Sequence, residues 1–157
     1  MANVKPIPQG YTSVTPSITV TDANKAIDFY KKALGATERE KFEGPDRKIM
    51  HAEIQIGTSI IMLGDEVMGQ RSAQSYGGSP ASFYVYVEDC DAAFKKALSA
   101  GGKQIVPVTD MFWGDRMGAF EDPFGYKWNL ATHTKDMSPE EMKKAGEAWM
   151  KEMAGAR

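Results

Sequence analysis

The chain has 157 residues, of which 42% are hydrophobic and 25% are charged, a composition typical of one globular domain. Its net charge of −2 provides no basic surface for nucleic acids or anionic membranes, so we expect neither as a partner. The start of the chain lacks the apolar core of a signal peptide, and apolar runs such as 59–63 are too short to span a bilayer. The single cysteine, Cys90, excludes an intramolecular disulfide, so we expect a soluble cytoplasmic protein.

The first half of the chain predicts a strand, a helix and three further strands. Polar and apolar residues alternate up to Val20, and Asp22 is suited to cap the helix that follows. Apolar residues then recur at helical spacing as far as Gly35, which favours a helix end. Three strand-like segments follow, separated by turn residues, and they span 37–42, 48–56 and 59–63.

The second half repeats this order 64–67 residues later. Val87 and Asp89 correspond to Val20 and Asp22, and a second helical pattern ends at Gly101. Three more strand-like segments span 103–108, 116–121 and 126–132, with an Asp-Pro-Phe-Gly turn before the last. The repeat predicts an α+β fold in which two tandem βαβββ modules form a curved mixed sheet around a cavity.

We expect the whole of 1–157 to be a single domain. Module one spans 12–64, module two spans 80–133, and the tail spans 134–157. The segment 65–79 between the modules is polar and rich in glycine, which indicates a linker or a mobile flap over a site.

The tail predicts a helix from about Pro139 to Met153. Ser138-Pro139-Glu140-Glu141 is a capping-box signature, with proline at the first helical position. The helix carries an apolar stripe made of Met142, Ala145, Trp149 and Met153. This stripe must be covered, either by the helix's own domain or by a second copy of the chain in a dimer.

Two tandem βαβββ units, with Val-x-Asp before each helix and Asp-Pro-x-Gly before the last strand, resemble the glyoxalase/bleomycin-resistance (vicinal-oxygen-chelate) superfamily. The resemblance covers about residues 12–133. Within that superfamily, the segments 50–53, 112–116 and 122–128 resemble a bacterial branch of uncharacterised glyoxalase-like proteins. The resemblance implies the fold, and it does not imply glyoxalase activity.

In the metal-dependent members of this superfamily, the ligands lie on the first and fourth strands of each half. Counting from the strand-end aspartates and the turn glycines, the corresponding positions are held by Thr15, Ile61, Ser82 and Asn129. None of these is a good ligand for a divalent cation, which needs several His, carboxylate or thiolate groups. We therefore expect no metal and no other cofactor, the alternative being a divergent metal site that uses His51 and Glu53.

Period-two alternation divides the strands into a core-facing side and a cavity-facing side. The expected ligand-binding residues on the cavity side are polar or aromatic, and they are Thr15, Ser17, His51, Ser82, Tyr84, Tyr86 and Asn129. His51 is the candidate for proton transfer, because a histidine pKa of about 6.5 is close to working pH. The alternative is that His51 is only a hydrogen-bonding residue of its strand. Glu53 either orients His51, acts as a base, or is a surface carboxylate on an edge strand.

The segment 111–116 places two aromatic side chains beside a glycine, a carboxylate and a guanidinium. Trp113 is suited to stack on a ligand ring while Arg116 binds an anionic group. The alternative is an Asp115–Arg116 network that fixes the loop. Cys90 is expected to be inert, and the chain has no nucleophile elbow, phosphate loop or Cys-x-x-Cys pair.

The preferred interpretation is a metal-independent homodimer that encloses an aromatic or polar organic molecule, with sequestration as one use. One alternative is a lyase or isomerase with His51 as base and Arg116 as electrostatic stabiliser, or with relocated metal ligands. A second alternative is a protein-interaction module that uses the C-terminal helix. The sequence leaves open whether the protein is an enzyme.

Overall fold

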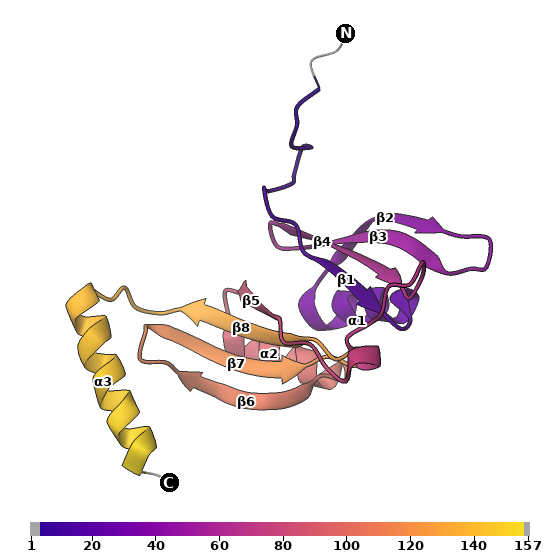
Figure 1. The fold of residues 1–157 in the computed structure, drawn as a ribbon. Helices are drawn as coiled ribbons and strands as arrows, with labels where there is room; N and C mark the ends of the chain where they lie inside the picture. The colour runs from indigo at the N-terminus through magenta and orange to yellow at the C-terminus, as the bar shows by residue number, and fades with distance from the viewer. Residues whose placement is uncertain (1–3, 156–157) are drawn as a thin grey trace.

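The structure is a computed structural model that describes residues 4–155 (Figure 1). The elements are β1 (Ser17–Val20), α1 (Ala23–Leu34), β2 (Thr37–Glu43), β3 (Ile49–Ile56), β4 (Ser59–Asp65), the 3-10 turn η1 (Gln74–Tyr76), β5 (Ser82–Tyr86), α2 (Cys90–Ser99), β6 (Lys103–Asp110), β7 (Asp115–Glu121), β8 (Lys127–His133) and α3 (Pro139–Gly155). This order confirms the predicted α+β class with two tandem βαβββ modules and a C-terminal helix.

Each module forms its own four-stranded mixed sheet. The strand orders are β1-β4-β3-β2 and β5-β8-β7-β6. In each sheet the first strand pairs in parallel with the fourth, and the remaining pairs are antiparallel. The sheet is thus divided into two, one part for each repeat.

Both predicted helix caps are present and have the same geometry. Asp22 Oδ1 accepts a hydrogen bond from the Lys25 backbone N–H at 3.0 Å, and Asp89 Oδ1 accepts one from the Ala92 N–H at 3.0 Å. Gly35 ends α1 in the left-handed region at φ 66°, where a residue without Cβ is favoured.

The core lies between the two sheets, where α1 and α2 pack against each other (Figure 1). Its largest fully buried side chains include Tyr30 from the first module and Phe120 and Trp128 from the second. Since both sheets turn their apolar faces toward this shared core, their outer faces point away from each other. The polar outer faces of the two modules therefore do not meet within one chain.

The connection between the modules is held by a carboxylate. Glu66 Oε1 accepts hydrogen bonds from the Ser72 N–H at 2.8 Å, from the Ser72 hydroxyl at 2.7 Å and from the Ser75 hydroxyl. The bonds from Ser75 and Ser72 lower the pKa of Glu66 to about 2. Gln74 accepts from Thr21 and donates to the Pro123 carbonyl, so this segment is fastened across the turn before β8.

Helix α3 projects from the end of the second sheet (Figure 1). Its capping box forms as predicted, with Ser138 N–H donating to Glu141 Oε2 at 2.9 Å and Glu141 N–H donating to Ser138 Oγ at 3.2 Å. The Trp149 ring lies 5.6 Å from the Phe112 ring, centroid to centroid, yet Trp149 remains 44% exposed. Its own domain therefore covers the apolar stripe only in part.

None of the helices within residues 4–155 is long and apolar enough to cross a membrane.

Candidate functional site

On the outer face of the first sheet, β3 presents His51 and Glu53. Glu53 Oε1 accepts a hydrogen bond from the Tyr11 hydroxyl and lies 3.4 Å from His51 Nε2. The bond from Tyr11 contributes most to lowering the pKa of Glu53, which favours its anionic form. Glu53 is only 5% exposed, and β3 lies inside the sheet. The interpretation of Glu53 as a surface carboxylate on an edge strand was wrong, because Tyr11 covers it.

The strand register corrects one of the four expected metal-ligand positions. In the second module, Asn129 pairs with Tyr84, which lies five residues before the capping Asp89. In the first module, the residue five before the capping Asp22 is Ser17, and it pairs with Met62, not with Ile61. Ile61 instead faces the helix and is 4% exposed. The reason is an offset of one residue between the β1–β4 and β5–β8 registers.

The donor set at these positions does not fit a divalent cation. Thr15 and Ser82 offer hydroxyls, Asn129 an amide, and Met62 a thioether, which is a weak ligand for hard ions. Across residues 4–155 there is also no cluster of three or more His, Cys, Asp or Glu side chains placed to hold a metal ion.

On the outer face of the second sheet, the carboxylate of Asp115 collects four hydrogen bonds. Oδ2 accepts from the Tyr84 hydroxyl at 2.9 Å, the Tyr86 hydroxyl at 3.1 Å and Trp113 Nε1 at 3.1 Å. Oδ1 lies 2.8 Å from His133 Nδ1. The Asp115 side chain is 3% exposed, so this anion is fixed under the two tyrosine hydroxyls. The strands β5, β7 and β8 each contribute to the cluster.

The hydrogen bonds in this cluster shift the pKa values of Asp115, His133 and Tyr84. Burial raises the pKa of Asp115, but the hydrogen bonds from His133, the tyrosines and Trp113 outweigh it, so the pKa lies below its ordinary value. The hydrogen bond to Asp115 and a second one to Asp136 raise the pKa of His133. Burial and the bond to Asp115 raise the pKa of Tyr84 to about 12, which keeps its hydroxyl protonated as a donor.

Arg116 lies on the opposite face of β7 from Asp115, because adjacent strand residues point to opposite sides. Its guanidinium binds both oxygens of Asp91 on α2, at 2.7 and 2.9 Å, and Asp110 at 3.0 Å. The alternative of an Asp115–Arg116 network is therefore wrong, since Arg116 binds Asp91 and Asp110 instead. Cys90 is buried, and burial raises the pKa of its thiol, in agreement with an inert cysteine.

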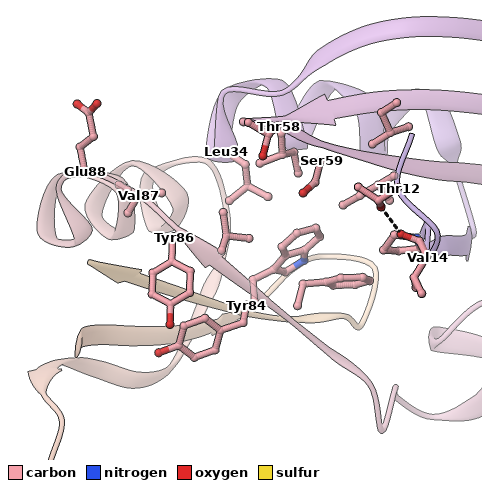
Figure 2. Close-up of a pocket in the computed structure, with 18 of the residues that line it drawn as sticks. Thr12, Val14, Leu34, Thr58, Ser59, Tyr84, Tyr86, Val87 and Glu88 are labelled. Atoms are coloured by element: carbon pink, nitrogen blue, oxygen red, sulfur yellow. Dashed lines mark hydrogen bonds between the residues drawn. The ribbon is translucent and has the colours of Figure 1, made fainter. Parts of the chain in front are cut away.

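A cavity of about 760 Å³ lies between the modules, and Tyr84 and Tyr86 of the Asp115 cluster are among its lining residues. Its lining includes Leu34, Ser59 and Ile60 from the first module and Phe83, Val85 and Trp128 from the second. Figure 2 shows the rings of Tyr84 and Tyr86 pointing away from Leu34 and Ser59. The apolar side of β5 thus faces the interior of this cavity. Tyr84 and Tyr86 also belong to its lining, while their hydroxyls donate to Asp115.

The structure brings together only part of the set expected from the sequence. Tyr84, Tyr86 and Trp113 converge on Asp115, and Asn129 lies beside Tyr84 with its amide donating to the Phe83 carbonyl at 3.2 Å. Ser82 begins β5 on the same face as the two tyrosines but makes no hydrogen bond to Asp115. Other members lie elsewhere: Arg116 is on the far face of β7, and Thr15, Ser17, His51 and Glu53 belong to the first module. Asp115 as an organising group and His133 as its partner were missed, although the hairpin register places them opposite each other.

Replacing Asp115 with asparagine is expected to lower the pKa of His133 toward 6.5, because the carboxylate is the main cause of its elevation. NMR titration of the imidazole resonances measures this, and the chain's two histidines are assigned with His133→Gln. Since the folded pKa of His133 lies above the unfolded value, its interaction stabilises the fold below about pH 6.5 and is lost as the pH rises through the folded pKa. Asp110→Asn on the opposite face is the control. An unchanged His133 titration in Asp115→Asn would contradict the assignment.

The chain is similar in sequence and in fold to known proteins. The model of the Glyoxalase/Bleomycin resistance protein/Dioxygenase superfamily matches residues 11–130. An uncharacterised protein from Mycobacterium bovis is 38% identical over 138 residues, covering 85% of this chain and 91% of its own length. An uncharacterised protein from Arabidopsis thaliana is 30% identical over 115 residues, covering 68% of this chain and 69% of its own length.

Solved structures show the same arrangement. The structure of a gene product from Arabidopsis thaliana superposes with a TM-score of 0.64 at 28% identity, covering 77% of this chain and 98% of its own. TioX from Micromonospora sp. ML1 gives 0.61 at 23% identity, covering 81% and 100%. The fosfomycin resistance protein FosX from Listeria monocytogenes gives 0.59 at 15% identity, covering 83% and 97%. At these lower identities, the likeness to TioX and FosX shows the fold alone.

Proposed function

Because the chain belongs to the glyoxalase/bleomycin resistance protein/dioxygenase superfamily, we propose that it binds a small organic molecule on the outer face of its second sheet. The observation that carries this proposal is the Asp115 carboxylate, which fixes the hydroxyls of Tyr84 and Tyr86 and the indole N–H of Trp113. Aromatic side chains held in place before binding lose little conformational freedom when a ligand arrives. Their rings supply stacking area, and each tyrosine oxygen keeps an acceptor lone pair.

The proposed ligand is an aromatic or polar organic compound held without a metal ion. The hydroxyl, amide and thioether groups of Thr15, Ser82, Asn129 and Met62 support a metal-free site, since they are poor donors for divalent cations. We place this activity in the cytoplasm, and sequestration of the compound is its simplest use.

We propose that the binding surface is enclosed in a homodimer. Tyr86 is 63% exposed on the second sheet and Phe42 is 62% exposed on the first, which leaves large apolar groups uncovered on both outer faces. Since these faces point away from each other in one chain, a first-sheet face can cover a second-sheet face only if it comes from another copy. A two-fold dimer would form two such enclosed sites.

Proton transfer by His51 is a second candidate function. The proximity of Glu53 to His51 Nε2, at 3.4 Å, favours it, because a neighbouring carboxylate can orient an imidazole for proton transfer. In this case electrostatic stabilisation would come from a group other than Arg116, whose donors already bind Asp91 and Asp110. Such an enzyme would be a lyase or an isomerase.

Binding of the neutral aromatic probe 1-naphthamide tests the proposed site. In NMR titrations the probe is expected to shift the ring resonances of Tyr84 and Tyr86. Replacing both tyrosines with alanine should weaken binding by about tenfold, the equivalent of about 1.4 kcal/mol. Tyr76→Ala, at a tyrosine that is 69% exposed on the linker, is the matched control. Undiminished binding to the double variant, with shifts at Val85 and Leu34, would move the site to the cavity between the modules.

A further inference from the structure

His133 lies at the end of β8, on the same outer face of the second sheet as Tyr84 and Tyr86, and its two ring nitrogens have different surroundings. Nδ1 faces the buried Asp115 carboxylate at 2.8 Å, and Nε2 lies 3.0 Å from Oδ1 of Asp136. The His133 side chain is 50% exposed, whereas that of Asp115 is 3% exposed. The buried Asp115 carboxylate therefore fixes the orientation of the imidazole ring, and Nε2 is directed toward solvent, where Asp136 lies.

Asp136 holds its position beside Nε2 weakly. Its side chain is fully exposed and lies three residues after His133, just beyond the end of β8. An exposed ion pair of this kind contributes little stability, because water and salt screen it. A carboxylate from a ligand can replace that of Asp136 once the Asp136 side chain rotates away.

Two aromatic rings lie next to this position. Tyr84 and Tyr86 donate to the same carboxylate that His133 contacts, and their ring centroids are 5.3 Å apart at an angle of 52°. The rings are neutral and partly exposed, and within residues 4–155 the one basic group in direct hydrogen-bond contact with Asp115 is His133. An acidic group and an adjoining flat ring on one ligand would thus meet the imidazolium and the tyrosines together.

Building on the proposed function, we infer that the ligand is an aromatic carboxylate whose acid group binds His133 Nε2 in place of Asp136. The groups facing this position are Asp115 from β7, Tyr84 and Tyr86 from β5, and Asp136 itself. Asp115 balances the charge of the imidazolium. The ligand's carboxylate would take over the pairing that Asp136 makes in the free protein, and the displaced Asp136 carboxylate would turn to solvent.

The inference is tested with 1-naphthoate and its neutral counterpart 1-naphthamide in calorimetric titrations at pH 6. The wild-type chain should bind naphthoate at least fivefold more tightly than naphthamide. Asp136→Asn should strengthen naphthoate binding about threefold and leave naphthamide binding unchanged, because the competing carboxylate is gone. His133→Gln should abolish the preference while keeping naphthamide binding.

The outcomes separate this inference from the proposed function. If both probes bind equally to the wild-type chain, or if Asp136→Asn leaves naphthoate binding unchanged, the carboxylate anchor is overturned while the tyrosine site stands. If neither probe shifts the ring resonances of Tyr84 and Tyr86 in NMR titrations, the proposed function fails as well. Asp136 is fully exposed, so the Asp136→Asn comparison remains decisive even if His133→Gln does not fold.

Discussion

Replacing Asp122 with alanine is expected to lower the free energy of unfolding by about 3–5 kcal/mol, because four donors lose their buried acceptor. Oδ2 accepts from the Tyr30 hydroxyl at 2.7 Å and from Trp128 Nε1 at 2.8 Å. Oδ1 accepts from the N–H groups of Phe124 and Tyr126 at 2.8 and 2.9 Å. Tyr30 belongs to α1 of the first module, so this carboxylate joins the two modules as well as shaping the turn before β8.

Urea unfolding followed by circular dichroism measures the effect. Asp28→Ala, on the exposed side of the same helix α1, is the matched control and should stay within about 0.5 kcal/mol of the wild type. Tyr30→Phe removes one of the four donors and should cost about 1 kcal/mol. A loss below about 1 kcal/mol in Asp122→Ala would show that water replaces the carboxylate and that it does not link the modules.

The effect should also depend on pH. Burial raises the pKa of Asp122, so the folded chain holds this proton more tightly than the unfolded chain. Tighter proton binding by folded Asp122 adds to the free energy of unfolding. This stabilisation is fully present below the ordinary carboxyl pKa of 3.8 and is lost as the pH rises through the elevated pKa of the folded chain. The difference between the wild type and Asp122→Ala is therefore expected to be larger at pH 4 than at pH 8.

The architecture was predictable because its signals are local and occur twice. Asp22 and Asp89 cap their helices with the same bond, and Gly35 ends α1 by a left-handed turn. Ser138 and Glu141 likewise specify the start of α3 within four residues. Each of these signals acts through hydrogen bonds between near neighbours, which residue types and spacing describe well.

The site depended on register and packing, which act over longer distances. Counting outward from Glu121 opposite Lys127 places Asp115 opposite His133, so this pair was within reach of the sequence. The approach of Tyr84 and Tyr86 to Asp115 needs the parallel pairing of β5 with β8, which no turn specifies. Because α1 packs on α2, the outer faces of the two sheets point away from each other. The period-two pattern of the strands shows which residues share a face, but it does not show how the two sheets are oriented relative to each other.

Replacing Gly114 with alanine is expected to destabilise the region after β8 by about 2–4 kcal/mol, part of it the left-handed penalty of about 1–2 kcal/mol. Gly114 has φ 95°, and a Cβ there would lie 2.1 Å from the Lys135 carbonyl oxygen. The Gly114 carbonyl accepts from the N–H groups of Thr134 and Lys135 at 2.9 and 3.0 Å and from the Thr134 hydroxyl at 2.9 Å. The added methyl group must push apart the two segments that these bonds join.

Hydrogen exchange of residues 134–155 measures the effect, with Gly77→Ala as the control. Gly77 has φ 80° and no atom within 4 Å of an added Cβ, so it reports the conformational penalty alone. Gly114→Ala should speed exchange in α3 and separate Asp136 from His133, since Lys135, whose carbonyl oxygen the added Cβ would contact, directly precedes Asp136. If both alanine variants cost the same and α3 stays protected, the chain relieves the contact by a small shift. The position of Asp136 beside the imidazole would then be set by its own rotamer instead of by the Gly114 hydrogen bonds.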